Sequence, residues 1–331
     1  MRALITGGAG FIGSHLVEHL LALGHEVVVL DDFSTGSMAN LTRTSDAVTM
    51  VRGSILDEAD VTEATDGCDT VFHLAAAVGV HTIVNRPLES LRKNLLGTET
   101  VLDVARRQGT RLLLASSSEV YGKNTKDRLD EDDDRVLGSP LKSRWSYAAV
   151  KGLDELMAYC YWREHGLRAV IVRPFNVVGP RQSARYGMVV PTLVGQALAG
   201  RPLTVHGDGT QRRCFCAVGD IVPALVALVT DPRAYGRVFN LGGTEEVSMR
   251  ELADRVLRVT GSHSPVVHVP YERAYEPGFE DMARRMPDTA RARQLIGYRP
   301  RTGLDEMIAA VAADQRGRAR ETVGTRTEES R

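Results

Sequence analysis

The amino-acid sequence predicts an α/β fold in which helices cover both faces of a parallel, doubly wound β-sheet. Short apolar runs alternate along the chain with stretches of helical periodicity. Continuous apolar runs are typical of strands that are buried on both faces. Strand–helix alternation is typical of parallel strands joined by crossover helices. The predicted strands are residues 3–5, 27–30, 48–51, 70–74, 112–115 and 169–172, and the predicted helices include residues 11–23 and 91–107.

After Pro174 the alternation changes, which indicates a second, smaller lobe. Residues 179–181 are a turn signal, residues 189–199 have a helical pattern, and residues 207–209 form a glycine-rich turn. Residues 237–241 read as one more buried strand that rejoins the first sheet, so the smaller lobe is interleaved with it. The expected parts are a first domain of residues 1–175 rejoined by about 215–245, a lobe of residues 176–214 and 246–314, and a polar, disordered tail of residues 315–331.

Composition favours a globular protein of the reducing cytoplasm. The 331 residues are 43% hydrophobic and 25% charged with a net charge of −1, which argues against a broad electrostatic grip on nucleic acid or on a membrane surface. Neither a secretory leader nor a membrane-spanning run is recognised. Four dispersed cysteines do not suggest a disulfide framework. We interpret Cys214 and Cys216 as alternating positions of one strand and expect no metal site.

A glycine-rich segment is the strongest local motif. Residues 6–13, Thr-Gly-Gly-Ala-Gly-Phe-Ile-Gly, follow the first predicted strand and open the first predicted helix, which is the context of a dinucleotide-binding turn. Gly7 permits the tight turn, Gly10 lets the backbone approach a pyrophosphate, and Gly13 allows close packing of helix on strand. The helix N-terminus offers free N–H groups to phosphate. A glycine turn without a ligand is the disfavoured alternative, because both flanking elements are present.

Two acids follow the second predicted strand. Asp31 or Asp32 can accept hydrogen bonds from the adenosine ribose hydroxyls, and a carboxylate there repels a 2′-phosphate. Because no arginine follows immediately to accept that phosphate, we predict NAD rather than NADP. Asp32 could instead cap the next turn, and both roles can hold at once.

Tyr147 and Lys151 are the predicted catalytic pair. Four residues apart on a helix, they share one face. An ammonium lowers the pKa of a nearby phenol and so favours proton abstraction. Such a pair is weak evidence alone, but it opens the helix after the fifth strand, which ends in Ser116-Ser117-Ser118-Glu119. Ligands of doubly wound sheets bind at the carboxyl ends of the strands, so these groups should converge on the nicotinamide.

With these motifs, the sequence resembles an extended short-chain dehydrogenase/reductase of the NAD-dependent nucleotide-sugar epimerase/dehydratase family. The resemblance rests on the glycine turn, on residues 116–122 and on Tyr147-x-x-x-Lys151, and it extends from residue 2 to about 312. It implies a Rossmann domain, a cytoplasmic homodimer formed through the helices that carry Asn94 and residues 147–162, and a UDP-sugar substrate. It also implies that the NAD pocket is lined by Phe11, Ile12, Ser54, Ile55, Leu74, Ala75, Ala76, Asn94, Pro174 and Phe175, besides Gly7, Gly10, Gly13, Asp31, Asp32, Tyr147 and Lys151. Where Ser54 stands, family members usually carry Asp, which affects the expected cofactor affinity but not the cofactor.

The resemblance also implies a nucleotide-sugar site in the lobe. Asn176 and Arg213 are expected on the sugar diphosphate, and the segment 202–206 around the nucleobase. Arginine suits a diphosphate because its guanidinium presents several donors in a fork. Arg212, by contrast, is better explained as a solvated charge. The implied substrate-binding residues are Asn176, Val190, Leu203, Val205, Arg213 and Arg285.

Among the family's reactions, the sequence favours decarboxylation of UDP-glucuronic acid. Ser117, Ser118 and Glu119 resemble the strand-end triplet of UDP-glucuronic acid decarboxylases, and Arg285 resembles the arginine that reaches the substrate in those enzymes. The predicted catalytic set is Tyr147, Lys151, Ser117, Ser118, Glu119 and Arg285. Oxidation at C4 would give a β-keto acid that loses CO2, yielding a UDP-4-keto-pentose, UDP-xylose or both. Glu119 would either repel the substrate carboxylate or position a proton donor. The alternatives are a UDP-sugar 4-epimerase and, less favoured, a non-catalytic NAD sensor.

Overall fold

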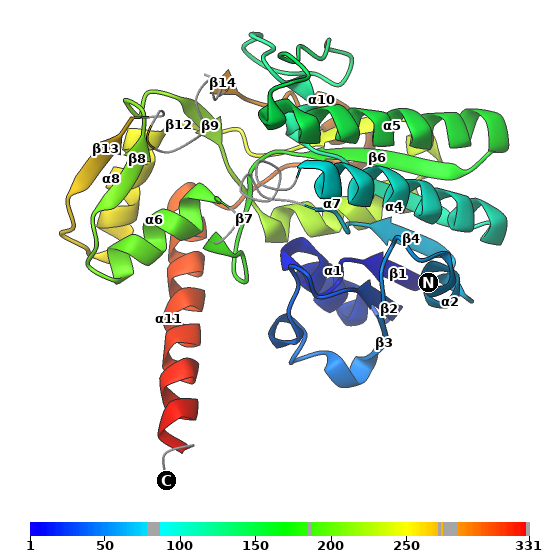
Figure 1. Cartoon of the computed structure of the whole chain (residues 1–331), viewed down its shortest axis with the longest axis horizontal. Helices are drawn as coiled ribbons and strands as arrows, with labels where there is room; N and C mark the ends of the chain where they lie inside the picture. Colours follow the sequence, from blue (N-terminus) through cyan, green and yellow to red (C-terminus); the bar gives the residue numbers. More distant parts are fainter. Residues whose placement is uncertain (78–86, 185–186, 271–272, 274–281, 283, 329–331) are drawn as a thin grey trace.

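A seven-stranded parallel sheet forms the centre of the molecule (Figure 1). The computed structural model describes residues 1–77, 87–184, 187–270, 273, 282 and 284–328. The strand order β11-β6-β5-β4-β1-β2-β3 reverses between β1 and β4, which confirms the doubly wound prediction. The strands are β1 Arg2–Thr6, β2 Glu26–Asp31, β3 Val48–Arg52, β4 Thr70–His73, β5 Arg111–Ala115, β6 Arg168–Pro174 and β11 Val238–Leu241.

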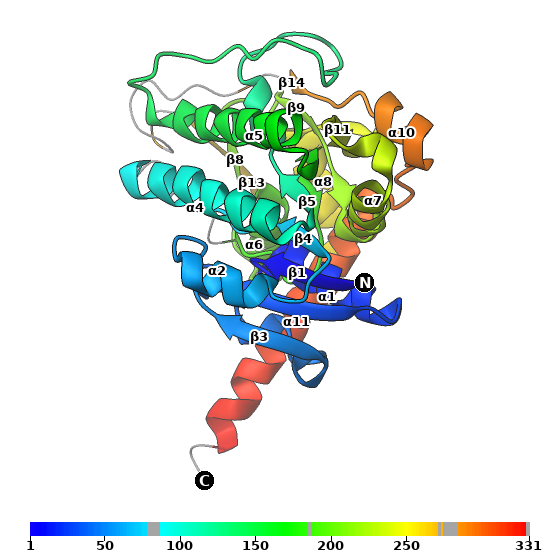
Figure 2. The same ribbon diagram turned by 90° about the vertical axis from the view of Figure 1, so that its right-hand side faces the viewer.

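Helices cover both faces of this sheet, as Figures 1 and 2 show from two directions. One layer contains α1 Phe11–Ala22 and α7 Val218–Thr230, with α10 Ala290–Ile296 beside α7. The other contains α2 Glu58–Thr65, α4 Pro87–Gln108 and α5 Ser146–His165, with α4 and α5 packed side by side. Because both faces are covered, the central positions of most strands are apolar, which is why these strands appear as continuous apolar runs in the sequence.

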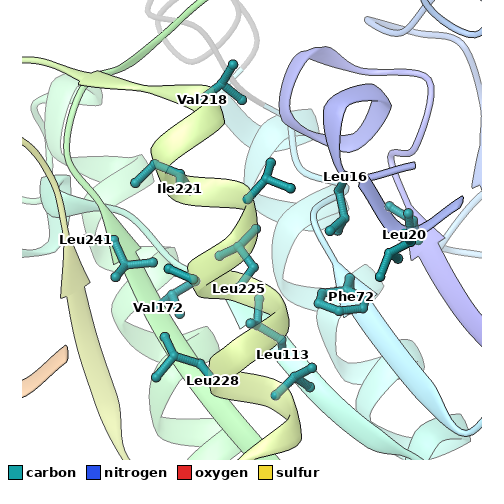
Figure 3. Packing of buried hydrophobic residues seen from close by; sticks show 14 of the residues in the cluster. Leu16, Leu20, Phe72, Leu113, Val172, Val218, Ile221, Leu225, Leu228 and Leu241 are labelled. Atoms are coloured by element: carbon teal, nitrogen blue, oxygen red, sulfur yellow. The ribbon is translucent and has the colours of Figure 1, made fainter. Parts of the chain in front are cut away.

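The core beneath α7 illustrates this packing (Figure 3). Ile221, Leu225 and Leu228 of α7 face the sheet and contact the apolar side chains of the strands beneath them, among them Val172 of β6. Leu16 of α1 extends the same cluster. The strand β11 comes from the chain segment after α7, so the predicted return of residues 237–241 to the first sheet is confirmed.

The smaller lobe is built from segments that alternate with those of the sheet domain. It contains α6 Val189–Leu198, α8 Met249–Thr260 and α11 Leu304–Glu328, which pack on one another around a second apolar core. Three small sheets complete the strand assignments of the described residues. They pair β8 Leu203–His206 with β13 Val266–Val269, β7 Val177–Val178 with β10 Cys216–Ala217, and β9 Arg212–Cys214 with both β12 Glu246–Ser248 and β14 Arg284–Arg285.

Short 3₁₀ helices connect several of these elements. Two of them lie at predicted catalytic residues: η3 contains Ser118 and Glu119, and η4 directly precedes α5, which carries Tyr147 and Lys151. The 3₁₀ helices are η1 Met38–Asn40, η2 Ser45–Ala47, η3 Ser118–Tyr121, η4 Ser143–Trp145 and η6 Pro232–Ala234.

The part of the chain expected to be a disordered tail from Gln315 begins within α11, which is assigned to Glu328. The Gln315 side chain donates a hydrogen bond to the carbonyl oxygen of Pro191. Cys214 and Cys216 do not alternate on one strand but lie on β9 and β10, in different small sheets, and both are buried. No helix in the described residues is long and apolar enough to cross a membrane.

Candidate active site

A cavity of about 610 Å³ lies where the carboxyl ends of the parallel strands meet the smaller lobe. Its walls include the turn after β1 and the residues that follow β2, β4 and β5. Residues of α6, β8 and β9 line it from the lobe. The cavity therefore lies at the reversal of strand order between β1 and β4, the place where ligands bind in open parallel sheets.

Two positions near the start of α1 admit only glycine, Gly7 in the turn after β1 and Gly13 in the first turn of α1. Gly7 has a φ of +73°, and a Cβ on it would lie 2.9 Å from the backbone nitrogen of Ala75. A Cβ on Gly13 would collide with the carbonyl oxygen of Gly7. Gly10 precedes the first residue of α1, so the amino end of that helix borders the cavity. The glycine turn and the amino end of α1 together suit the pyrophosphate of a dinucleotide, because this group binds where the backbone can approach it closely.

The two acids after β2 have different surroundings. Asp31 is buried, and its carboxylate accepts hydrogen bonds from the backbone N–H groups of Ala9 at 2.9 Å and Phe33 at 2.8 Å. Burial raises the pKa of Asp31, although these hydrogen bonds oppose the shift. Asp32 is more exposed, borders the cavity and accepts the backbone N–H of Ser34 at 2.9 Å. Asp31 therefore braces the glycine turn, while Asp32 caps the next turn and is the acid better placed for a ribose.

Most of the other residues expected around the cofactor border the cavity. The exceptions are Ser54, Asn94, Lys151 and Phe175, which do not border it. The Ser54 hydroxyl accepts the backbone N–H of Leu56 at 3.2 Å. The Asn94 side chain is buried and accepts the N–H of Ala77 at 2.7 Å, which ties α4 to the segment after β4. The bordering residues are Gly7, Gly10, Phe11, Ile12, Gly13, Asp31, Asp32, Ile55, Leu74, Ala75, Ala76, Tyr147 and Pro174.

Tyr147 and Lys151 lie in the first two turns of α5, as expected, but only Tyr147 borders the cavity. Tyr147 forms a side-chain hydrogen bond with Ser117. Lys151 is 2% exposed, and its Nζ donates to the carbonyl oxygen of Ala115 at 3.1 Å. The same Nζ lies 3.1 Å from the carboxylate of Asp154, which is completely buried. The ammonium is thus fixed behind the phenol by α5 and by the end of β5.

The expected net decrease in the pKa of Tyr147 is not found. Burial raises this pKa, and the ammonium of Lys151 lowers it only in part. Glu119 and Asp154 add to the increase because their negative charges disfavour a phenolate. A positively charged nicotinamide ring bound beside the phenol would act in the same direction as Lys151.

Glu119 is held between two arginines. Its Oε2 accepts a hydrogen bond from Arg144 Nη1 at 2.6 Å, and its Oε1 accepts one from Arg285 Nη1. Burial alone would raise the pKa of Glu119, but the two guanidinium groups outweigh burial and hold the pKa at about 2. The three side chains are between 11% and 19% exposed and border the cavity. Glu119 is therefore ionised at neutral pH, with both oxygens ion-paired.

The serines beside Glu119 also border the cavity. Ser117 Oγ accepts the backbone N–H of Glu119 at 3.2 Å, so the hydroxyl stabilises the turn that presents the carboxylate. Ser118 is 2% exposed at the start of η3. The predicted triplet thus lies together with Tyr147 on one wall of the cavity.

The residues expected around the sugar nucleotide come from the loop after β6 and from α6, β8, β9 and β14. Asn176 has a φ of +39°, and its amide links Arg285 Nη2, at 2.7 Å, to the carbonyl oxygen of Cys214, at 2.8 Å. Arg213 is buried and donates to the carbonyl oxygen of Arg212 at 2.8 Å. Arg212 itself is 42% exposed. The cavity borders Asn176, Val190, Val205, Arg213 and Arg285, whereas Leu203 is fully buried in the lobe core.

A buried polar network supports this wall from behind. Arg173 of β6 forms a two-pronged ion pair with Glu155 of α5, at 2.8 and 2.6 Å. Ser116 Oγ donates to the same carboxylate, and Arg173 also donates to the hydroxyl of Tyr121 at 2.9 Å. Asn240 of β11 accepts the hydrogen bond of that hydroxyl at 2.8 Å. The network links the ends of β5, β6 and β11 to the helix that carries Tyr147.

Sequence reasoning missed two charged residues that border the cavity, Arg144 and Lys93. Arg144 lies three residues before Tyr147, which was a signal that it could reach the same site. Lys93 directly precedes Asn94 and pairs with Asp32 at 2.5 Å. Both are polar residues near helix ends, a pattern that by itself indicates solvent exposure.

The fold and the cavity together define a dinucleotide-binding α/β protein with a tyrosine-based site for redox chemistry. The chain belongs to the NAD dependent epimerase/dehydratase family, which it matches over residues 3–242. This match confirms the family and the cofactor that the sequence motifs predicted.

Similar proteins include decarboxylases and epimerases of nucleotide sugars. The chain is 40% identical over 312 residues to UDP-N-acetyl-alpha-D-glucosaminuronate decarboxylase of Bacillus cytotoxicus, covering 93% of this chain and 96% of that protein. It is 35% identical over 305 residues to UDP-glucuronic acid decarboxylase 1 of Danio rerio, covering 92% and 70%. The crystal structure of UDP-glucuronic acid 4-epimerase from Bacillus cereus, in complex with UDP-glucuronic acid and NAD, has a TM-score of 0.84 at 28% identity, covering 95% and 98%.

Gly13→Ala is expected to abolish NADH binding, because the added methyl group collides with the carbonyl oxygen of Gly7 and displaces α1 from the turn. NADH fluorescence titration measures the loss. Gly219→Ala is the matched control, since a Cβ on this exposed position of α7 meets nothing within 4 Å. The control should bind NADH normally and gain up to about 1 kcal/mol of helix stability. Equal binding by both variants would contradict the proposed role of the turn.

The ion pairs of Glu119 should stabilise the fold in a pH-dependent way. The folded-state pKa of about 2 lies below the ordinary glutamate value of 4.5, so the stabilisation is present above about pH 4.5 and is lost as the pH falls toward 2. The difference in unfolding free energy between the wild type and Glu119→Gln should therefore be largest at neutral pH and shrink between pH 4.5 and 3. Denaturant titrations at these pH values measure it, and a difference that grows on acidification would contradict the assignment.

Proposed function

We propose that this chain decarboxylates a UDP-hexuronic acid through a 4-keto intermediate. UDP-glucuronic acid is the substrate that the sequence resemblance favours, and the product would be UDP-4-keto-pentose, UDP-xylose or both. The names of the similar proteins support decarboxylation. One of them is named for UDP-N-acetylglucosaminuronic acid, which is therefore the second substrate to test beside UDP-glucuronic acid.

The observation that carries this proposal is the charge of the cluster around Glu119. One carboxylate and two guanidinium groups sum to a single positive charge beside Tyr147. A partly desolvated site with this charge favours a monoanion such as the C5 carboxylate of a hexuronic acid. A neutral hexose would leave the excess charge without a partner. The two ion pairs also offset the repulsion between Glu119 and a substrate carboxylate, so the second expected role, positioning of a proton donor, is the better supported.

The side chains on the cavity wall suit the steps of this reaction. When bound, NAD supplies the acceptor for the hydride from sugar C4. Tyr147 takes the proton of the 4-hydroxyl, with Ser117 as its hydrogen-bond partner and Lys151 favouring the phenolate. In the resulting β-keto acid the C5–C6 bond breaks, CO2 leaves, and the electron pair of that bond forms an enolate with the C4 carbonyl. A water molecule then supplies the proton that adds to C5, because Glu119 is ionised and can only hold that water in place.

A UDP-sugar 4-epimerase is the second candidate, because it needs the same first step. The solved structure of a UDP-glucose 4-epimerase from Thermotoga maritima with UDP-glucose has a TM-score of 0.87 at 28% identity. An epimerase acting on UDP-glucose has no anion for the cluster of Arg144 and Arg285, whereas one acting on UDP-glucuronic acid has the same carboxylate as the proposed substrate. We rank epimerisation second because the more similar relatives, at 35–40% identity, are named decarboxylases. The non-catalytic sensor is disfavoured because Tyr147, Lys151 and Ser117 lie together in the site.

Incubation of the protein with NAD+ and UDP-glucuronic acid, followed by mass spectrometry, tests the proposal. Loss of CO2 from the substrate is expected, with Tyr147→Phe slower by about 10²- to 10⁴-fold because the proton acceptor is missing. A parallel reaction with UDP-N-acetylglucosaminuronic acid identifies the preferred substrate. A 4-epimer of unchanged mass would establish the epimerase instead, and no conversion of any uronate would contradict decarboxylation.

We also propose that the protein is a cytoplasmic homodimer. All four cysteines are free, which suits a reducing compartment, and fractionation of the producing cells would test the location. The exposed apolar side chains of the adjacent helices α4 and α5 suit a subunit interface. These side chains are Leu88, Leu96, Leu153, Leu156 and Tyr159.

Leu153→Asp combined with Leu156→Asp should convert the dimer to a monomer, because two carboxylates would be buried at the interface without partners. Light scattering after size-exclusion chromatography measures the mass. Leu141→Asp is the control, since Leu141 is 94% exposed and lies outside α4 and α5. A wild-type mass of one chain would contradict the dimer.

A further inference from the structure

The ammonium of Lys151 is buried against the carboxylate of Asp154, three residues further along α5. The two side chains are 2% and 0% exposed, and Lys151 Nζ lies 3.1 Å from Asp154 Oδ2. The same Nζ donates to the carbonyl oxygen of Ala115 at 3.1 Å, and Lys151 does not border the cavity. In this arrangement the ammonium therefore acts on Tyr147 through its charge and not through a contact with the ligands.

The neighbouring ionisable groups on the elements around this ammonium are neutral or already paired. Glu155 of the same helix forms its two-pronged ion pair with Arg173 of β6. At the end of β4, burial and the nearby ammonium lower the pKa of His73 to about 3, so its ring is neutral at working pH. From α4 comes the uncharged hydroxyl of Thr98, which also favours the carboxylate of Asp154. Asp154 is therefore the group that balances the charge of the ammonium.

A buried ammonium without a counter-charge loses its proton easily, and the pKa of a fully buried lysine can fall to about 5 to 6. Burial lowers the pKa of Lys151, but interactions led by the Asp154 carboxylate outweigh burial and hold that pKa above its ordinary value. A neutral amine at this position would no longer favour the phenolate of Tyr147, which burial and the charge of Glu119 disfavour. The catalytic pair therefore depends on a group that keeps the amine protonated.

We propose that Asp154 is a positioning residue of the acid–base pair, which holds Lys151 behind Tyr147 and keeps it an ammonium although it is buried. Without this carboxylate, Lys151 is a neutral amine in the alkaline part of the pH range. The inference rests on the proposed role of Tyr147 and Lys151 in the first step, which decarboxylation and epimerisation share. It does not depend on which UDP-sugar reacts.

Replacement of Asp154 by asparagine tests this proposal, because Asp154→Asn keeps the shape of the side chain and removes its charge. The pH dependence of kcat is measured with UDP-glucuronic acid and NAD+. The wild-type kcat should rise as the phenol of Tyr147 ionises and should not fall again up to pH 10. The kcat of the variant should instead fall by about tenfold or more between its optimum and pH 10, because Lys151 loses its proton.

Thr98→Val is the matched control, since it removes a hydroxyl beside the same carboxylate without changing any charge. The pH profile of this control should keep the wild-type shape. An alkaline fall in Thr98→Val as well as in Asp154→Asn would overturn the proposal, because any disturbance of the pair would then have the same effect. The absence of an alkaline fall in Asp154→Asn would overturn it too.

Unfolding by denaturant at pH 7 and pH 10 tests the charge of Lys151 without any turnover. In unfolded Asp154→Asn the lysine keeps its proton up to about pH 10.4, whereas in the folded variant it loses the proton at lower pH. The unfolded state then binds more protons, so the stability of the variant rises with pH. Its destabilisation relative to the wild type should therefore shrink from pH 7 to pH 10. A pH-independent difference would overturn the proposal, even if UDP-glucuronic acid proves not to be the substrate.

A second variant covers the case in which Asp154→Asn does not fold, as circular dichroism would show. Asp154→Asn combined with Lys151→Met contains no unpaired charge at this place and should fold again. Failure of the double variant to fold would mean that Asp154 supports the packing of α5 by its shape, which contradicts the proposal.

Discussion

The ion pairs of Glu119 bring together three parts of the chain that the reaction needs in one place. The glutamate follows β5, Arg144 precedes α5, and Arg285 lies on β14. Arg285 also holds Asn176 after β6, so one guanidinium connects the sheet domain with the lobe segments that face it. Because the cluster is largely buried, loss of one partner would leave an uncompensated charge, which is strongly destabilising. The width of the sugar end of the cavity therefore depends on this cluster.

Behind the cluster, the chain uses a second set of paired charges to position the catalytic helix. Glu155 and Arg173 tie α5 to β6, and the buried pair of Lys151 and Asp154 fixes the ammonium behind Tyr147. Such pairs gain little net stability over apolar residues but require one arrangement of the groups that form them. The orientation of the phenol toward the cavity is thereby set by α5 itself, and not by a mobile loop.

Much of the fold could be predicted because a strand that is buried on both faces of the sheet appears in the sequence as a continuous apolar run. Each of the seven strands of the main sheet lies at a predicted apolar run, and the glycine turn lies where the motif placed it. The hydrogen bond from Gln315 to Pro191 could not be predicted, because it joins residues far apart in the chain. The prediction that Cys214 and Cys216 share one strand was wrong because the chain passes from one small sheet to another between them. A sequence pattern of alternating residues looks the same whether or not such a change occurs.

The sequence by itself determined the parallel sheet, the glycine turn after β1 and the position of Tyr147 on the helix after the fifth strand, because each depends on residues close together in the chain or on local steric limits. The tertiary structure alone decided which of the two acids braces the glycine turn, that Lys93 pairs with the other, and which arginines hold Glu119. Those pairings join residues up to 166 positions apart. A charged residue in a polar segment looks the same in the sequence whether it lies in solvent or in an ion pair, and only the packing of α4, α5 and β14 around the strand ends distinguishes the two.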